Sequence, residues 1–253
     1  MPLFKNKWSV DDKLIADLRN KFLDDLKTDE DRYHADDIQR VKENDWFIGR
    51  YLLHNDKDLD KAYRMLTDSL KFRNDMEINT VTKKDLPKEY FDVRAVIMYN
   101  KDKRDHPVVA IRCKTHIKKE ETRRLQQQYM LYWIETAVRA SDWGVVSILF
   151  DCTDAGVYNV DLDMMRSLSD AFKKYYPWGL GYFLVYNMPW YLSAVWKIIK
   201  KWIPQRHEAI FHFVDSKSIQ EFMSEDQLPS CMGGTSTKMY EPKEGYKDGD
   251  ESD

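Results

Sequence analysis

The chain has 253 residues, of which 43% are hydrophobic and 33% are charged, and its net charge is −3. This length and apolar content suffice for one large α/β domain together with a smaller helical part. Residues 241–253 hold six acids and two lysines. The preceding body is therefore close to neutral, which argues against nucleic-acid binding as its main function. No uncharged stretch is long enough for a transmembrane helix, and no signal-peptide pattern is visible at the start.

The first 90 residues carry apolar side chains at helical spacing. The pattern predicts three helices, over about 8–26, 35–53 and 59–73. We therefore predict an amino-terminal helical region over residues 1–90.

From residue 91 the pattern changes to strands that alternate with helices. Strands are predicted at 93–99, 107–113, 145–150, 181–186 and 210–214, and helices at about 120–139, 161–175, 190–203 and 216–223. Strands separated by helices at this spacing imply βαβ crossovers and a mostly parallel sheet. We predict an α/β domain over 91–240, followed by a disordered acidic tail over 241–253.

Residues for catalysis or metal binding are not predicted. The three cysteines match no zinc spacing, and reduced thiols favour a reducing, cytoplasmic compartment. His207 and His212 are five residues apart across a strand start, which disfavours a metal site. Asp151 and Asp154 are typical of a strand-end turn and a helix cap rather than of an acid pair. We expect no enzyme activity and no cofactor.

The predicted helix over 190–203 is unusually apolar. Ser193, Lys197, Lys200 and Lys201 fall in one arc of about 100° on a helical wheel, and apolar residues fill most of the remainder. A helix packed on one side of a core needs an apolar stripe of only about 100°. The excess apolar surface therefore favours contact with lipid, a partner or a cavity. The alternative is a fully buried crossover helix whose lysines reach out to solvent.

Six short motifs occur in order along the chain. They are Lys61-Ala62 with Met65-Leu66, Lys101-Asp102-Lys103 with Pro107-Val108, Phe150 to Gly156, Tyr176-Pro177, Asn187 to Trp190, and Leu228-Pro229 with Gly233-Gly234. With these motifs the chain resembles, from about residue 36 to 235, the CRAL-TRIO lipid-binding family, which includes carriers of phosphatidylinositol, retinaldehyde and tocopherol. The resemblance implies a mostly parallel sheet that forms the floor of an apolar cavity, an amino-terminal helical bundle, and a gate helix that opens at a membrane.

This resemblance implies the following sites. The ligand cavity is expected to be lined by Tyr129, Trp133, Ile148, Phe150, Leu168, Phe172, Phe183 and Val185. The gate helix, over 190–203, is expected to meet the membrane through Trp190, Tyr191, Val195, Trp196, Ile198, Ile199 and Trp202. Lys197, Lys200 and Lys201 are expected to contact headgroups or the membrane surface. A bound lipid or another hydrophobic small molecule is expected.

The chain departs from the family's phosphatidylinositol carriers at their headgroup positions. Asn55, Asp56, Trp178 and Ala209 stand where those carriers have a basic pair, a glutamate and a lysine. The lipid identity therefore stays open, as does a cavity filled by side chains in a membrane-targeting or protein-interaction module. The expected partners are membrane lipid and a membrane surface, with contact-site proteins if the chain is part of a larger tethered protein. A peripheral location on cytoplasmic membranes, such as endoplasmic reticulum or lipid droplets, follows from these expectations.

Overall fold

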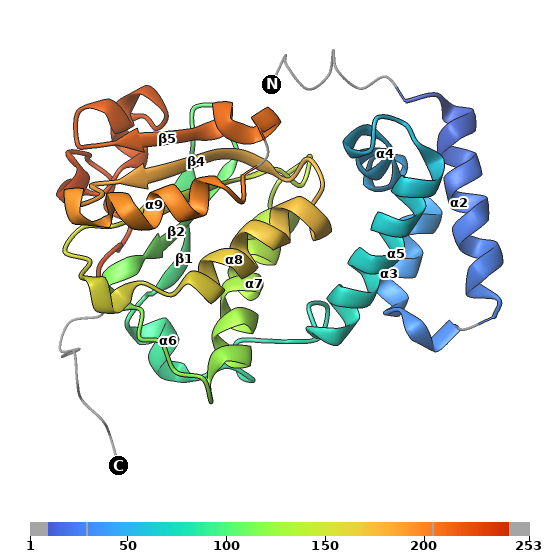
Figure 1. Cartoon of the computed structure of the whole chain (residues 1–253), viewed down its shortest axis with the longest axis horizontal. Coiled ribbons are helices and arrows are strands. Elements are labelled where there is room, and N and C mark those ends of the chain that lie inside the picture. The colour runs from blue at the N-terminus through green and yellow to red at the C-terminus, as the bar shows by residue number, and fades with distance from the viewer. Residues whose placement is uncertain (1–9, 29, 204, 243–253) are drawn as a thin grey trace. The chain divides into compact units, whose positions relative to one another are not determined.

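The structure, a computed structural model, describes residues 10–28, 30–203 and 205–242. The chain forms two compact units (Figure 1). The helical unit comprises residues 1–81 and 170–179, and the sheet unit comprises residues 82–169 and 180–253. Most of the predicted acidic tail lies outside the described residues.

The described residues of the helical unit form four α-helices: α2 (Asp12–Leu26), α3 (Ala35–Glu43), α4 (Asp45–His54) and α5 (Leu59–Asp75). Their apolar stripes meet in one core that includes Leu18, Phe22 and Leu66. The prediction of one helix over 35–53 is wrong. Asn44 interrupts it with an extended backbone (φ −113°, ψ 101°), and its side chain accepts the N–H of Phe47 at 2.8 Å, which caps α4.

Residues 170–179 join the helical unit although they follow α8 (Leu162–Asp170) in the chain. The Ser69 hydroxyl donates to the Tyr175 carbonyl at 2.9 Å, and Arg50 Nε donates to the Pro177 carbonyl at 2.8 Å. The rings of Phe72 and Tyr175 stack with centroids 3.7 Å apart. These contacts explain why the Tyr176-Pro177 turn belongs to this unit.

The sheet unit holds five strands: β1 (Val96–Lys101), β2 (Pro107–Arg112), β3 (Val146–Asp151), β4 (Leu180–Tyr186) and β5 (Phe211–Val214). Their order in the sheet is the order in the chain. β1 and β2 pair antiparallel, and the other neighbours pair parallel. The predicted mostly parallel α/β sheet is confirmed.

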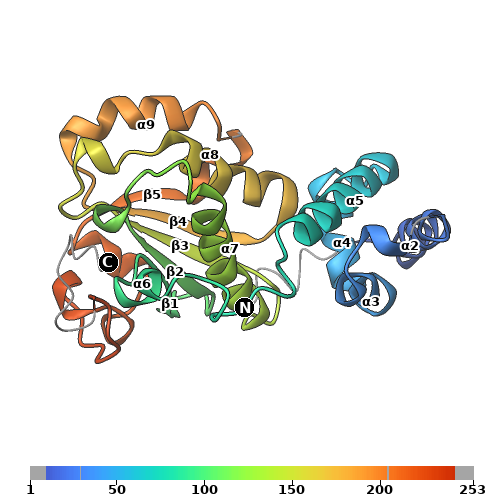
Figure 2. The ribbon, with the colours of Figure 1, turned by 90° about the horizontal axis from the view of Figure 1, so that it is seen from below.

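Helices cover one face of this sheet. Parallel neighbours are joined through α7 (Arg123–Arg139), α8 and α9 (Ser193–Lys200), while α6 (Lys88–Asp92) precedes β1. Crossovers of one hand between sequential neighbours place their helices on the same face. Figure 2 shows α8 and α9 on one side of the sheet and the segment after β5 on the other. That segment closes the second core with Ile219, Met223, Leu228, Met232 and Tyr240.

Three predicted helices differ from the observed ones. The chain over 190–203 starts as a 3-10 turn (Trp190–Leu192) before α9, so the regular helix is shorter. The end of 161–175 is a π-helical turn over Ala171–Tyr175, closed by a hydrogen bond from Tyr176 N to Ala171 O. The helix over 216–223 is wrong, because Asp215 accepts the N–H groups of Lys217 and Ser218 and only the 3-10 turn Ser218–Glu221 follows.

Candidate functional site

A cavity of about 350 Å³ lies in the sheet unit, between the helix-covered face of the sheet and helices α7 and α8. Its volume is within the lower part of the range of small-molecule sites, about 300–1,000 Å³. The lining residues come from α6, the chain into β1, the ends of β2 and β3, the loops after β2 and β3, α7 and α8. The cavity therefore joins segments that are far apart in sequence, from Glu89 to Leu168.

One wall of the cavity is apolar. Its members are Val93, Val96, Ile111, Met130, Phe150, Met164, Met165 and Leu168. Tyr129 also lines this wall, but its hydroxyl lies 2.7 Å from the Tyr90 carbonyl and 2.8 Å from the Val96 carbonyl. Burial raises the pKa of Tyr129 to about 12, so the hydroxyl stays protonated and anchors the ring. This wall can hold a hydrocarbon chain.

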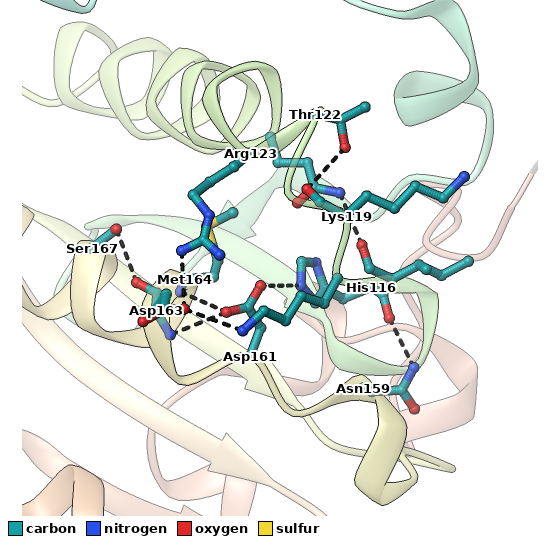
Figure 3. Close-up of polar contacts among 12 residues, drawn as sticks. His116, Lys119, Thr122, Arg123, Asn159, Asp161, Asp163, Met164 and Ser167 are labelled. Atoms are coloured by element: carbon teal, nitrogen blue, oxygen red, sulfur yellow. Dashed lines mark hydrogen bonds and ion pairs between the residues drawn. The ribbon is translucent and has the colours of Figure 1, made fainter.

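Polar residues also line the cavity, and Figure 3 shows His116, Asn159 and Asp161 grouped together; we call this group the polar end of the cavity. His116 Nε2 lies 3.1 Å from Asp161 Oδ2, while Asp161 Oδ1 accepts the N–H of Met164 at 3.0 Å and caps α8. The Asn159 amide donates to the His116 carbonyl at 2.9 Å. The lining residues Glu89, Ile117 and Lys119 are exposed, so the cavity opens beside them.

The predicted cavity residues fall into three groups. Tyr129, Phe150 and Leu168 line the 350 Å³ cavity. Ile148, Phe183 and Val185 share the sheet face of Phe150 but are not among its lining residues, and Phe183 stacks on Phe211 with centroids 4.7 Å apart.

The remaining two predicted cavity residues pack elsewhere. Trp133 contacts Phe91 and Tyr132, and Phe172 lies in the helical unit against Tyr176. Sequence reasoning missed His116 and Asn159. His116 lies in the lysine- and arginine-rich stretch 114–124, which is the sequence signal nearest to it.

Helix α9 lies over the strands at the far edge of the sheet. Trp196 contacts Phe211 and Phe213, with ring centroids 6.0 and 4.8 Å apart, yet no side chain of α9 is buried. Trp190, in the turn before α9, is 85% exposed, and Ile198 is 44% exposed. The helix thus keeps large apolar side chains in contact with solvent.

The α9 lysines lie on the exposed surface of the sheet unit. Lys197, Lys200 and Lys201 are all exposed, and Lys200 Nζ lies 3.7 Å from the Glu208 carboxylate. Ala209 lies nearby in sequence, within the turn that precedes β5, whereas Asn55, Asp56 and Trp178 belong to the helical unit.

Comparison with known proteins identifies the family. The family model of the CRAL/TRIO domain matches residues 92–234, which is more than half of the chain. The chain belongs to the CRAL/TRIO domain family. The matched residues cover the whole sheet, the cavity lining from Val93 onward, and α9.

Two curated CRAL/TRIO relatives illustrate the similarity. The chain is 26% identical over 192 residues to the phosphatidylinositol transfer protein CSR1 of Eremothecium gossypii, covering 70% of this chain and 44% of that protein. It is 25% identical over 146 residues to the CRAL-TRIO domain-containing protein C3H8.02 of Schizosaccharomyces pombe, covering 56% of this chain and 33% of that protein. The chain thus spans less than half the length of either relative.

A solved structure shares the CRAL/TRIO fold. The crystal structure of Sfh5 superposes with a TM-score of 0.68 at 15% sequence identity, covering 91% of this chain and 90% of that chain. At this identity the match concerns the fold. Within the described ranges, no helix is long and apolar enough to cross a membrane, and no group of three or more His, Cys, Asp or Glu side chains could hold a metal ion.

Proposed function

We propose that the chain binds one hydrophobic lipid molecule in the cavity between the sheet, α7 and α8, and that it transfers this lipid between membranes without enzymatic chemistry. The observation that carries the proposal is the cavity itself, whose lining combines apolar side chains with a polar pair, His116–Asp161. Such an arrangement fits an amphiphile, whose chain is held by burial and whose polar end is held by hydrogen bonds. The similarity to a phosphatidylinositol transfer protein supports lipid as the ligand class.

The volume of the cavity limits the size of the ligand that it can hold. At about 350 Å³ the cavity lies near the small end of the range of small-molecule sites, about 300–1,000 Å³. A single hydrocarbon chain fits this space, whereas two chains and a bulky headgroup need more room. Burial stabilises such a chain by about 25 cal/mol per Å² of apolar surface. We therefore favour a single-chain ligand, in line with the replacement of the inositol-carrier residues by Asn55, Asp56, Trp178 and Ala209.

Helix α9 is proposed to dock the protein peripherally on cytoplasmic membranes such as endoplasmic reticulum or lipid droplets. Trp190, Tyr191 and Ile198 are exposed, and tryptophan and tyrosine favour the membrane interface. Lys197, Lys200 and Lys201 would add about 1 kcal/mol each against an anionic surface. Membrane-contact-site proteins remain proposed partners, since the curated relatives are more than twice as long as their matched regions.

Native mass spectrometry of the chain purified gently from cells tests the ligand. We expect one lipid per chain, identified after extraction. A protein without bound lipid would contradict the proposal and favour the alternative, a membrane-targeting or protein-interaction module without an exchangeable ligand.

Vesicle flotation tests docking by α9. Trp190→Glu with Ile198→Glu should reduce binding at least about tenfold, because two exposed apolar side chains are replaced by charges. Ser193→Glu with Ala194→Glu is the matched control, since it adds the same two charges at exposed positions of the same helix. Equal binding by both variants would contradict a docking role for α9.

A further inference from the structure

Exposed apolar side chains gather at the carboxyl ends of the parallel strands. Ile117 in the loop after β2 is 63% exposed, Val157 and Tyr158 after β3 are 70% and 77% exposed, and Trp190 follows β4. The carboxyl ends of parallel neighbours meet at one edge of a sheet. We call residues 113–119, 152–160 and 187–192 the edge loops.

Hydrogen bonds join the three edge loops. Asn159 donates to the carbonyls of Lys114 and His116, at 3.2 and 2.9 Å, so the second loop lies against the first. The Tyr191 hydroxyl donates to the Ala155 carbonyl at 2.7 Å, so the third loop lies against the second. The exposed apolar side chains therefore project from one connected surface.

The ring of Tyr158 packs against the backbone of its own loop. A Cβ atom at Gly156 would lie 2.5 Å from Cε1 of Tyr158, so the ring packs directly on the glycine backbone. The phenol stays 77% exposed in this position. The ring of Tyr158 is therefore held by the backbone on one side and exposed to solvent on the other, so it can contact a binding partner without rearrangement.

The edge loops carry more basic than acidic side chains. They hold three lysines, Lys114, Lys118 and Lys119, and a single acid, Asp154. Lys114 Nζ lies 3.5 Å from Asp154 Oδ2, and Lys118 Nζ lies 3.2 Å from Asp163 Oδ2 on α8. Tyrosine and tryptophan favour the boundary between headgroups and hydrocarbon, and lysines nearby are attracted to anionic lipids. Beyond the proposed role of α9, we propose that the edge loops form a docking surface for an anionic phospholipid bilayer, with Ile117, Val157 and Tyr158 inserting at the interface.

Two of the edge loops also line the cavity. His116, Ile117 and Lys119 belong to the first loop and Asn159 to the second, and all four are lining residues. A bilayer bound at the edge loops would therefore face the polar end of the cavity. The link between the bilayer and the cavity rests on the proposed lipid ligand, whereas the docking surface itself does not depend on that ligand.

Flotation of the full chain with phosphatidylcholine vesicles, with and without phosphatidylserine, tests the docking surface. The triple variant Ile117→Asp, Val157→Asp and Tyr158→Asp should lose at least about tenfold in binding to the phosphatidylserine vesicles. The control Met239→Asp changes a side chain of similar exposure, 57%, in the same unit but outside the edge loops. It should bind within about twofold of the parent chain.

Two results would overturn the inference. One is unchanged vesicle binding by the triple variant at an unchanged melting temperature, and the other is an equal loss with Met239→Asp. Lipid occupancy, read by native mass spectrometry on the same samples, separates this inference from the proposed function. A chain without bound lipid whose vesicle binding depends on the edge loops would contradict the ligand and support the docking surface.

Discussion

His116 Nε2 lies 3.1 Å from Asp161 Oδ2, and this contact connects the loop after β2 to the first turn of α8. Burial alone would raise the pKa of Asp161. Hydrogen bonds from the Met164 N–H and from His116 outweigh burial and lower the pKa below its ordinary value. The carboxylate is thus held in its charged form at the polar end of the cavity.

Asp161→Asn should lower the free energy of unfolding of the protein at neutral pH. It should also make this free energy less sensitive to a fall in pH. A lowered folded-state pKa contributes stability that is present above the unfolded pKa, about 4, and is lost as the pH falls through the folded pKa. The difference in free energy of unfolding between the parent chain and Asp161→Asn should therefore shrink below about pH 4. Urea unfolding at several pH values measures it, and a difference that grows in acid would refute the assignment.

A buried carboxylate also connects the β1–β2 loop to β3. Asp102 Oδ2 accepts from Ser147 Oγ at 2.6 Å and lies 3.0 Å from His106 Nδ1, while Asp102 Oδ1 accepts the N–H groups of Arg104 and His106. Ser147 Oγ in turn accepts the N–H of Tyr182 on β4 at 2.8 Å. The aspartate of the Lys101-Asp102-Lys103 motif is therefore structural, and it fixes three neighbouring segments.

Asp102→Asn should destabilise the protein by about 2 kcal/mol, because a buried hydrogen-bonded charge is replaced by an amide with two donors. Asp105→Asn is the control in the same loop, since the Lys101–Asp105 pair is exposed and such pairs contribute about 0–1 kcal/mol. Chemical unfolding at neutral pH compares the two variants. Equal effects would mean that the buried network adds little.

The sheet could be predicted from sequence because its strands are buried runs of apolar residues. Apolar residues follow one another almost without interruption in Val146–Asp151 and in Leu180–Tyr186. Such runs are typical of strands that are covered on both faces. The break at Asn44 could not be predicted because the helical spacing of apolar residues continues across it. The break is made by the Asn44 side chain, which accepts the N–H of Phe47 and so caps the second helix.

The cavity could be predicted only in part. Phe150 and Leu168, which the family resemblance implied, line the cavity because each lies on the inner face of its own element. The polar end depends on the contact between His116 and Asp161, which are 45 residues apart. Local pattern carries no information on such a contact. The placement of Phe172 in the other unit likewise depends on tertiary packing of residues 170–179.

Thiol reactivity should separate the three cysteines. Cys113 and Cys152 are buried with their Sγ atoms 3.9 Å apart, and burial raises the pKa of Cys113 well above its ordinary value. Cys231 is exposed. A thiol-specific chromogenic reagent at pH 8 should therefore modify one thiol rapidly and the other two only on unfolding. Cys231→Ser should abolish the rapid phase, and a persisting rapid phase would show that the buried pair is accessible.

Filling the cavity should remove the ligand without removing membrane docking. Met164 and Leu168 lie four residues apart on α8 and both line the cavity, so Met164→Trp with Leu168→Trp would fill part of the cavity and block a ligand chain there. Native mass spectrometry should then show a chain without lipid, while vesicle flotation stays unchanged because the edge loops and α9 are intact. Met164→Leu with Leu168→Met is the control that keeps the side-chain volume. If the filled variant still carried one lipid, the ligand would have to lie outside this cavity, which would contradict the proposed binding site.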